Sequence, residues 1–265
     1  MHLKYILAND GAEAGFSSLI LWVGTGINET QAMYDTLPAA VPLILSGRIA
    51  SLGHGHARSA IDKSPVKGPW RIERTGLVGD EQADERHHGG PEKALHHYPF
   101  EHYETWRASL GDNALLHKTG AFGENISTSG WTEETVHVGD IIRFGGVLLQ
   151  VSQARQPCWK LNVRLGSEGI ARRMQSAAIT GWYYRVLEPG CAEPGALLTL
   201  EHRPQPRWPL SRTLRLLYRD LDAYDELQDM AGVSELSDGW RRLAARRSAT
   251  KTIEDWTVRL HGGGA

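Results

Sequence analysis

The feature that most constrains the fold is a stretch of strict alternation interrupted by two glycines. In the segment DIIRFGGVLLQVSQ, apolar residues occupy every second position on both sides of Gly145-Gly146. Such alternation is typical of strands with one face in a core, and a two-residue glycine loop favours a tight antiparallel connection. The sequence therefore predicts a β-hairpin here. Its alternating positions are Ile142, Phe144, Val147, Leu149 and Val151.

Short strands and helical inserts are predicted on both sides of this hairpin. An apolar alternating segment, LILSGRIASL, predicts a first strand from Leu43, and WRIE, GWYYRVLEPG and GALLTLEHR predict three more. Helices are predicted from Pro91 through PEKALHHY, then in EHYETWRASL, and in EGIARRMQSAAITG. Short strands with Gly and Pro turns indicate a mainly β fold, a β-barrel with helical inserts over residues 43–203.

The character of the chain changes after Arg203. A proline-rich linker, PQPRWP, leads into leucines at helical spacing, and glycine breakers divide residues 208–262 into three predicted helices. We expect this small three-helix domain to be separate, so that the barrel folds without it. Eleven basic against nine acidic residues over 203–260 do not favour nucleic-acid binding.

The first 42 residues show no clear periodicity. Their longest apolar run, Leu19–Val23, is much too short for a membrane helix, and we expect an N-terminal extension without a membrane partner. Met33 would serve equally well as an initiator. Only two cysteines in 265 residues argue against a disulfide framework and predict a cytoplasmic location.

Cys158 has the most reactive sequence context in the chain. Arg155 precedes it by three residues and Lys160 follows it by two, and nearby cations stabilise a thiolate that can bind a soft metal. A cysteine between Pro157 and Trp159 is nevertheless more often a small core residue, and the residues alone favour that interpretation. Cys191 lies among acidic and turn-forming residues, so we interpret it as a surface-turn residue.

Five histidines gather within sixteen residues, but their spacing matches no zinc signature. Gly89 and Gly90 follow His88 and precede the predicted helix at Pro91, whose N-terminus would attract an anion. A simple glycine turn is the alternative. If 91–98 is helical, His96 and His97 must point to different faces. These histidines are His87, His88, His96, His97 and His102.

Two further groups of polar residues lie in short motifs that are too common to indicate a function. Glu124 and Asn125 in the triplet GEN would bind either a heterocycle edge or neighbouring backbone, and the triplet alone decides nothing. Asp80 and Asp140 each follow a Val-Gly pair, where turn capping explains them as well as catalysis does.

Taken in order, four segments resemble the MOSC domain, the C-terminal type of molybdenum cofactor sulfurases, in its YiiM-like bacterial branch. The tail, with LSRTLRLLYRD and SDGWRRLAARR, is similar to the three-helix domain that follows it there, whereas residues 1–42 match nothing in that branch. The four segments are TGLVGDEQAD, HHGGPEKALHHYP, FGENISTSG and VHVGDIIRFGGVLLQVSQARQPCWKLN.

The resemblance implies a MOSC-type β-barrel in which Cys158 ligates the molybdenum of a molybdopterin cofactor. Because the HGG register makes His88 rather than His87 the motif histidine, His88 and Arg86 are implied as catalytic residues beside Cys158. The implied cofactor-binding residues are Gly89, Gly90, Glu124, Asn125, Arg155 and Lys160. Some MOSC relatives are associated with pyridoxal phosphate, but no lysine here has a setting that singles out a Schiff-base role, so we do not expect that cofactor.

The YiiM-like branch implies reduction of N-hydroxylated bases such as 6-hydroxylaminopurine to the amine, which detoxifies mutagenic base analogues. His88 or an acid would supply protons, and Arg86 or Arg155 would orient polar groups. No iron–sulfur cysteine set and no G-x-G-x-x-G motif is present, so a separate flavoprotein reductase is implied as electron donor. The alternative is a non-catalytic carrier of molybdenum cofactor, or of sulfur as a Cys158 persulfide.

Overall fold

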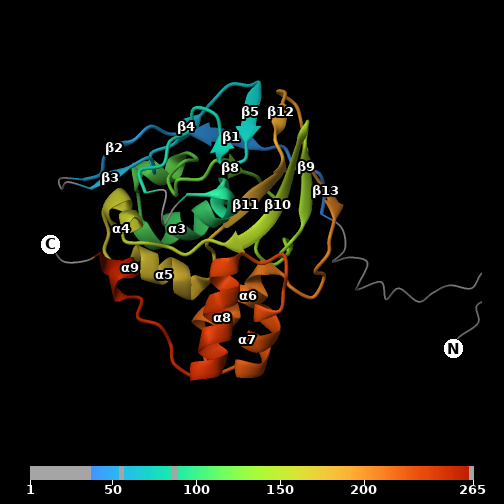
Figure 1. Ribbon diagram of the computed structural model, residues 1–265. Helices are drawn as coiled ribbons and strands as arrows, with labels where there is room; N and C mark the ends of the chain where they lie inside the picture. Colours follow the sequence, from blue (N-terminus) through green and yellow to red (C-terminus); the bar gives the residue numbers. More distant parts are fainter. Residues whose placement is uncertain (1–36, 54–56, 85–88, 263–265) are drawn as a thin grey trace, which may run out of the picture.

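The computed structural model (Figure 1) describes residues 37–53, 57–84 and 89–262. A curled sheet forms one part of the molecule, and the last helices of the chain form a bundle at one end of it. Residues 1–36, on which most of the expected N-terminal extension falls, lie outside the described residues.

The strands are β1 (Leu43–Ser46), β2 (Ala50–Ser51), β3 (Arg58–Ser59), β4 (Ser64–Pro65), β5 (Trp70–Glu73), β6 (Gly76–Leu77), β7 (Leu95–His97), β8 (Ile126–Ser127), β9 (Ile141–Phe144), β10 (Val147–Ala154), β11 (Trp182–Glu188), β12 (Gly190–Ala192) and β13 (Leu198–His202). The helices are the 3₁₀ turns η1 (Pro91–Lys93) and η2 (Ala114–His117), and α3 (His102–Leu110), α4 (Lys160–Leu165), α5 (Ile170–Ala177), α6 (Leu210–Tyr218), α7 (Tyr224–Ala231), α8 (Asp238–Thr250) and α9 (Thr257–His261).

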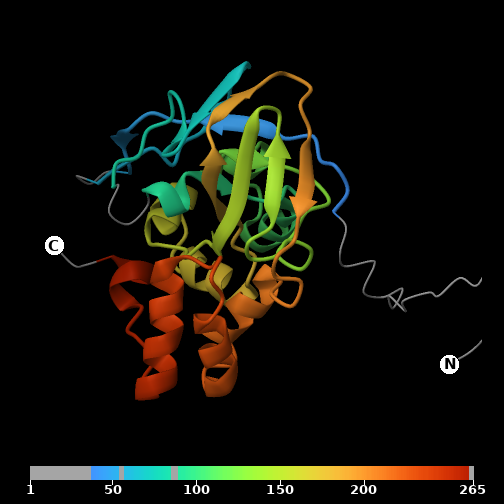
Figure 2. The same ribbon diagram turned by 45° about the vertical axis from the view of Figure 1, so that its right-hand side comes forward.

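The main sheet has eight strands in the order β13-β9-β10-β11-β7-β8-β1-β4, and it is antiparallel except where β7 meets β8. Ala40, just before β1, exchanges two backbone hydrogen bonds with Leu198 of β13, with N···O distances of 3.0 and 2.9 Å. This contact joins the segment before β1 to the edge strand β13, and the sheet is curled into a half-barrel (Figure 2). The predicted MOSC-type, mainly β fold is confirmed.

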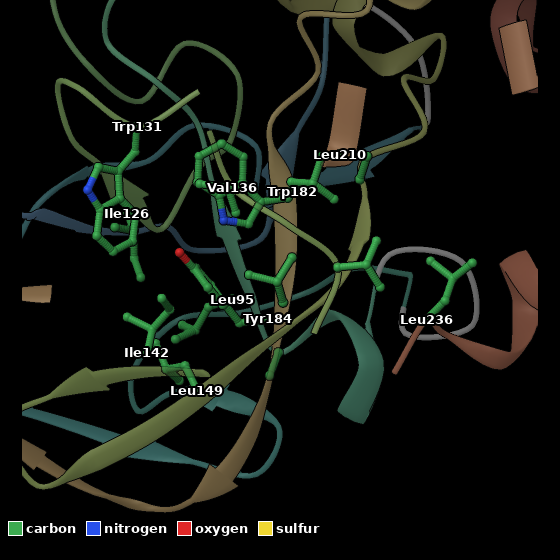
Figure 3. Close-up of a cluster of buried hydrophobic side chains, with 14 of the residues drawn as sticks. Leu95, Ile126, Trp131, Val136, Ile142, Leu149, Trp182, Tyr184, Leu210 and Leu236 are labelled. Carbon is green, nitrogen blue, oxygen red and sulfur yellow. The ribbon is translucent and has the colours of Figure 1, made fainter. Parts of the chain in front are cut away.

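The glycine hairpin forms as predicted. Val147 of β10 faces Phe144 of β9, which leaves Gly145-Gly146 as the loop, and Gly145 has a φ of 57°, a conformation that favours glycine. The alternating apolar side chains on both strands are buried. They form the centre of the barrel core, which Figure 3 shows around Ile142 and Leu149.

The predicted helix from Pro91 to Tyr98 is wrong. Pro91 begins only the one-turn η1, and the chain then extends into β7, which pairs with β11 on one side and β8 on the other. The backbone hydrogen bonds of both neighbouring strands outweigh the helix-forming residues Glu92–Leu95. By contrast, the helices predicted after it are present as α3 and α5.

The C-terminal helices pack onto the barrel and continue its core. Leu210 and Leu214 of α6 belong to the same buried cluster as Trp182 and Leu149 of the sheet, and Figure 3 shows Leu210 beside Trp182. This shared cluster argues against a barrel that folds without the tail. It does not test where one domain ends and the next begins.

The predicted three helices of the tail are α6, α7 and α8, but a fourth helix follows them. α9 returns to the barrel and lies beside α4 and α5 (Figure 1). Within the described ranges, no helix is long and apolar enough to cross a membrane.

Candidate functional site

One pocket brings Cys158 together with several charged, polar and aromatic side chains. It is walled by the segment before β4, the chain after β6, η1, strands β7 and β11, and the turn that follows β10. Its lining residues are Ser59, Ala60, Ile61, Lys63, Glu81, Gln82, Ala83, Asp84, Lys93, His96, Gly123, Asn125, Arg155, Cys158, Lys160 and Tyr183.

Cys158 lies in the turn between β10 and α4. Its side chain is nearly buried, with 6% of the residue exposed, yet it lines the pocket. Cys191 is exposed in β12, and neither of these two cysteines, the only ones in the chain, forms a disulfide. Cys158 is therefore buried, as the core alternative required, and at the same time positioned to meet a ligand.

Arg155 and Lys160 reach the same pocket, as the sequence spacing predicted. Arg155 is buried and its Nη1 donates to the carbonyl oxygen of Phe122 at 2.8 Å. Lys160 is more exposed, and its Nζ donates to the carbonyl of Arg58 at 3.3 Å. Both cations thus have a backbone acceptor in a distant segment of the chain, and both line the pocket together with Cys158.

Asn125 lines the pocket and belongs to a buried network that the sequence did not reveal. Its Nδ2 donates to Oδ2 of Asp80 at 2.8 Å, and the same carboxylate forms a salt bridge with Lys63. Asp80 also accepts from the backbone N–H of Gly47 at 2.8 Å. Asp80 therefore ties three separate segments together rather than capping its own turn.

Lys63 is a site residue that the sequence analysis missed. It is 7% exposed and lines the pocket. Burial lowers its pKa, and the neighbouring carboxylate of Asp80 opposes this shift without cancelling it. No motif marks it, because it approaches Asp80 only through the folded loop. Asp140, in contrast, does cap its turn, accepting from the N–H of His137 at 2.9 Å.

His96 is the second missed residue. It lies on the face of β7 that borders the pocket, 5.1 Å from the ring of Tyr183 between centroids, and its Nε2 is buried without a hydrogen-bond partner in the described chain. Burial lowers its pKa well below the usual value, and the charges of Arg155 and Lys63 act in the same direction. His96 is therefore a neutral imidazole with unused hydrogen-bonding capacity.

Glu124 does not line the pocket. Its carboxylate is fully buried and accepts hydrogen bonds from the backbone N–H of Gly120 at 2.7 Å and of Phe122 at 3.1 Å, and from the hydroxyl of Tyr103. All of these partners belong to the loop and helix that carry it. The structure thus gives Glu124 a loop-supporting role, and its implied contact with a cofactor stays a prediction.

The glycine motif is only partly described. Gly89 and Gly90 are not among the pocket-lining residues, and Gly90 has a φ of 89° with open space where a Cβ would be. The three-residue η1 provides no sustained helix dipole, so the predicted anion site loses its main support. Arg86, His87 and His88, including the implied catalytic pair, lie outside the described residues.

Metal ligands are sparse in this part of the molecule. Among the described residues, no group of three or more His, Cys, Asp or Glu side chains is arranged to hold a metal ion. The soft donor that lines the pocket is the thiol of Cys158.

Comparison with known proteins decides the family. Residues 84–199 match the MOSC domain, and residues 208–250 match the YiiM-like, 3-alpha helix domain. Protein YiiM of Escherichia coli (strain K12) is 40% identical over 222 residues, covering 83% of this chain and 97% of that protein. The chain belongs to the MOSC family, in its YiiM-like branch.

Two further relatives agree with this assignment. The crystal structure of YiiM from Escherichia coli has a TM-score of 0.72 at 32% identity, covering 84% of this chain and 98% of that chain. A protein of Gibberella moniliformis (strain M3125 / FGSC 7600) named "Reductase" is 39% identical over 196 residues, which cover 71% of this chain and 35% of the fungal protein. This chain thus corresponds over 71% of its length to part of a protein named "Reductase".

Proposed function

We propose that this MOSC protein is a molybdenum-cofactor-dependent reductase of N-hydroxylated compounds such as 6-hydroxylaminopurine. The observation that carries the proposal is the position of Cys158, a nearly buried thiol at a pocket wall shared with Arg155 and Lys160. Family membership and the relative named "Reductase" support the oxidoreductase class.

The pocket residues fit an anionic cofactor. Four cationic side chains line the described pocket, against the carboxylates of Glu81 and Asp84; Glu81 is paired with Arg48, and Lys63 is paired with Asp80. The cations are Lys63, Lys93, Arg155 and Lys160. Excess positive charge in a partly enclosed site favours an anion such as the phosphate of a pterin cofactor. The unsatisfied Nε2 of His96 offers one more polar contact.

The reaction converts R–NHOH, two protons and two electrons into R–NH₂ and water, so the N–O bond breaks and an N–H bond forms. A molybdenum centre, when bound at Cys158, supplies two-electron chemistry and a site that accepts oxygen. Arg155 and Lys160 would hold anionic groups of the cofactor. A separate flavoprotein reductase would deliver the electrons.

Proton delivery falls to groups that keep a proton at neutral pH. Burial raises the pKa of Tyr183, so its hydroxyl stays protonated beside His96 and can donate a hydrogen bond to the substrate. Neutral His96 can orient that substrate but is not an acid at this pH. We retain His88 as the proposed proton donor and Arg86 as the proposed orienting cation.

The test is molybdenum analysis of protein from a host that makes the cofactor, combined with 6-hydroxylaminopurine reduction by a chemically reduced dye. We expect about one molybdenum per chain. Cys158→Ser should lose both metal and activity while its thermal unfolding is unchanged, and Cys191→Ser should keep both. Full activity in Cys158→Ser would refute the ligand assignment, and a Cys158 persulfide without metal would instead support the carrier alternative.

A further inference from the structure

The turn that carries Cys158 is held on both sides by one residue from the far end of the chain. Nη1 of Arg259 donates to the carbonyl oxygen of Pro157 at 2.5 Å, and the N–H of Trp159 donates to the carbonyl oxygen of Arg259 at 2.8 Å. These two backbone groups flank Cys158 directly. Arg259 therefore holds the turn by two hydrogen bonds, one from its side chain and one to its main-chain carbonyl.

The guanidinium of Arg259 is itself fixed. Its Nη2 donates to Oε1 of Gln175 in α5 at 2.6 Å, and Gln175 is buried. The ring of Tyr218 lies 6.0 Å from the guanidinium carbon. A planar guanidinium with two anchored nitrogens has little freedom left, so it transmits the position of α5 and α6 to the carbonyl of Pro157.

The helix that carries Arg259 depends on the same contacts. α9 has five residues, too few to be stable alone. Nδ2 of Asn162 in α4 donates to the carbonyl of Leu260 at 3.0 Å, and Leu260 is buried. Hydrogen bonds thus join α9 to both α4 and the Cys158 turn. α9 also lies beyond both matched domains, which end at residues 199 and 250.

We infer that Arg259 is a positioning residue for Cys158, and that the C-terminal helix α9 completes the pocket by fixing the direction of the thiol. The functional meaning rests on the proposed role of Cys158 as the metal ligand. The geometric claim does not, because the mobility of the thiol can be measured in metal-free protein.

The experiment uses the full chain carrying Cys191→Ser, so that Cys158 is the only thiol, and measures its second-order rate of alkylation by iodoacetamide. In Arg259→Ala, two charge-assisted hydrogen bonds are lost and the rate should rise at least about tenfold. Arg259→Lys keeps the charge and one donor, so its rate should stay within about threefold of the parent. Arg246→Ala removes an exposed arginine of α8 and is the matched control, with no expected change.

A second variant and a second measurement separate a loss of positioning at Cys158 from a general loss of stability. Gln175→Ala removes only the anchor of the guanidinium and should raise the rate by about threefold, since the bond to Pro157 remains. In cofactor-loaded protein, Arg259→Ala should also lose molybdenum faster than Arg246→Ala does. Equal alkylation rates in Arg259→Ala and Arg246→Ala would overturn the inference, as would a rise that merely follows a lower global unfolding midpoint. A chain that never binds molybdenum would defeat the proposed function and leave the alkylation result to decide on Arg259.

Discussion

The two faces of β7 give neighbouring histidines opposite environments. His97 points into the barrel core, where Nδ1 contacts the hydroxyl of Tyr184 at 3.0 Å and Nε2 contacts Oγ1 of Thr128 at 2.8 Å. His96 points to the pocket and leaves Nε2 without a partner. Both are almost inaccessible to water. Burial therefore does not distinguish the two histidines; their hydrogen bonds do, because His97 has both ring nitrogens paired and the Nε2 of His96 is open.

The buried cluster on the core side of β7 is larger than the cluster beside the pocket. The ring of His97 lies 4.3 Å from that of Trp182, which belongs to the cluster that continues into Leu210 and Leu236 of the tail (Figure 3). The pocket face adjoins a second, smaller cluster around Phe122 and Tyr98. Changes on the core face should therefore cost stability, and changes on the pocket face should cost ligand binding.

The largest expected effect is on the core face. Deleting residues 205–265 removes α6 to α9 and exposes the part of the cluster that Leu210 and Leu214 cover, so we expect the barrel to lose its cooperative thermal unfolding. Circular dichroism melts of the full and shortened chains check this. A shortened chain that unfolds cooperatively at the original midpoint would restore the view, drawn from the PQPRWP linker, that the barrel stands alone.

Alanine at each histidine compares the two faces directly. His97→Ala leaves a cavity beside Trp182 and strands two hydroxyl partners, and should lower the free energy of unfolding by about 2–4 kcal/mol. His96→Ala should cost less than about 1 kcal/mol, yet it should lower the reduction rate at least about tenfold because the substrate loses an orienting contact. Urea unfolding and steady-state rates measure both. Equal losses of stability would contradict the assignment of the faces.

Acid should destabilise the fold through the buried side chain of His97. Burial lowers the pKa of His97 to about 3, whereas the unfolded chain takes up this proton near pH 6.5. The unfolded state binds more protons between these values, so the free energy of unfolding falls as pH drops through this window. From pH 7.5 to 5.0 His97 alone should remove about 2 kcal/mol. His97→Gln should flatten that slope in urea titrations, and an unchanged slope would mean that His97 takes up its proton as readily in the folded state as in the unfolded chain.

A modest change in stability is expected at Gly90, in the turn before η1. Gly90 has a φ of 89° and no atom within 4 Å of an added Cβ, so Gly90→Val suffers backbone strain without a packing clash. We expect a loss of about 1–2 kcal/mol in unfolding free energy, together with reduced molybdenum content if this turn contacts the cofactor. Full molybdenum content in Gly90→Val would make the glycines a turn and nothing more.

The parts of the fold that were predicted correctly depend on short-range patterns. The hairpin at Gly145-Gly146 and the helix at Ile170–Ala177 have a clear period and clear turn residues. The prediction for the segment after Pro91 was wrong because its residues suit a helix locally. Only the pairing with β11 and β8 makes this segment a strand. That error did not affect one consequence: His96 and His97 do point to different faces, through the alternation of a strand instead of the turn of a helix.

The sequence by itself determined the family, the barrel and the residues close to Cys158, since Arg155 and Lys160 are near it along the chain and reach the pocket through local geometry. Only the tertiary structure decided which distant residues complete the site. Lys63 and His96 enter through loops and strand pairing, and Arg259 enters from about a hundred residues downstream. The physical reason is that hydrogen bonds and burial act over a few ångströms in space, whatever the separation along the chain.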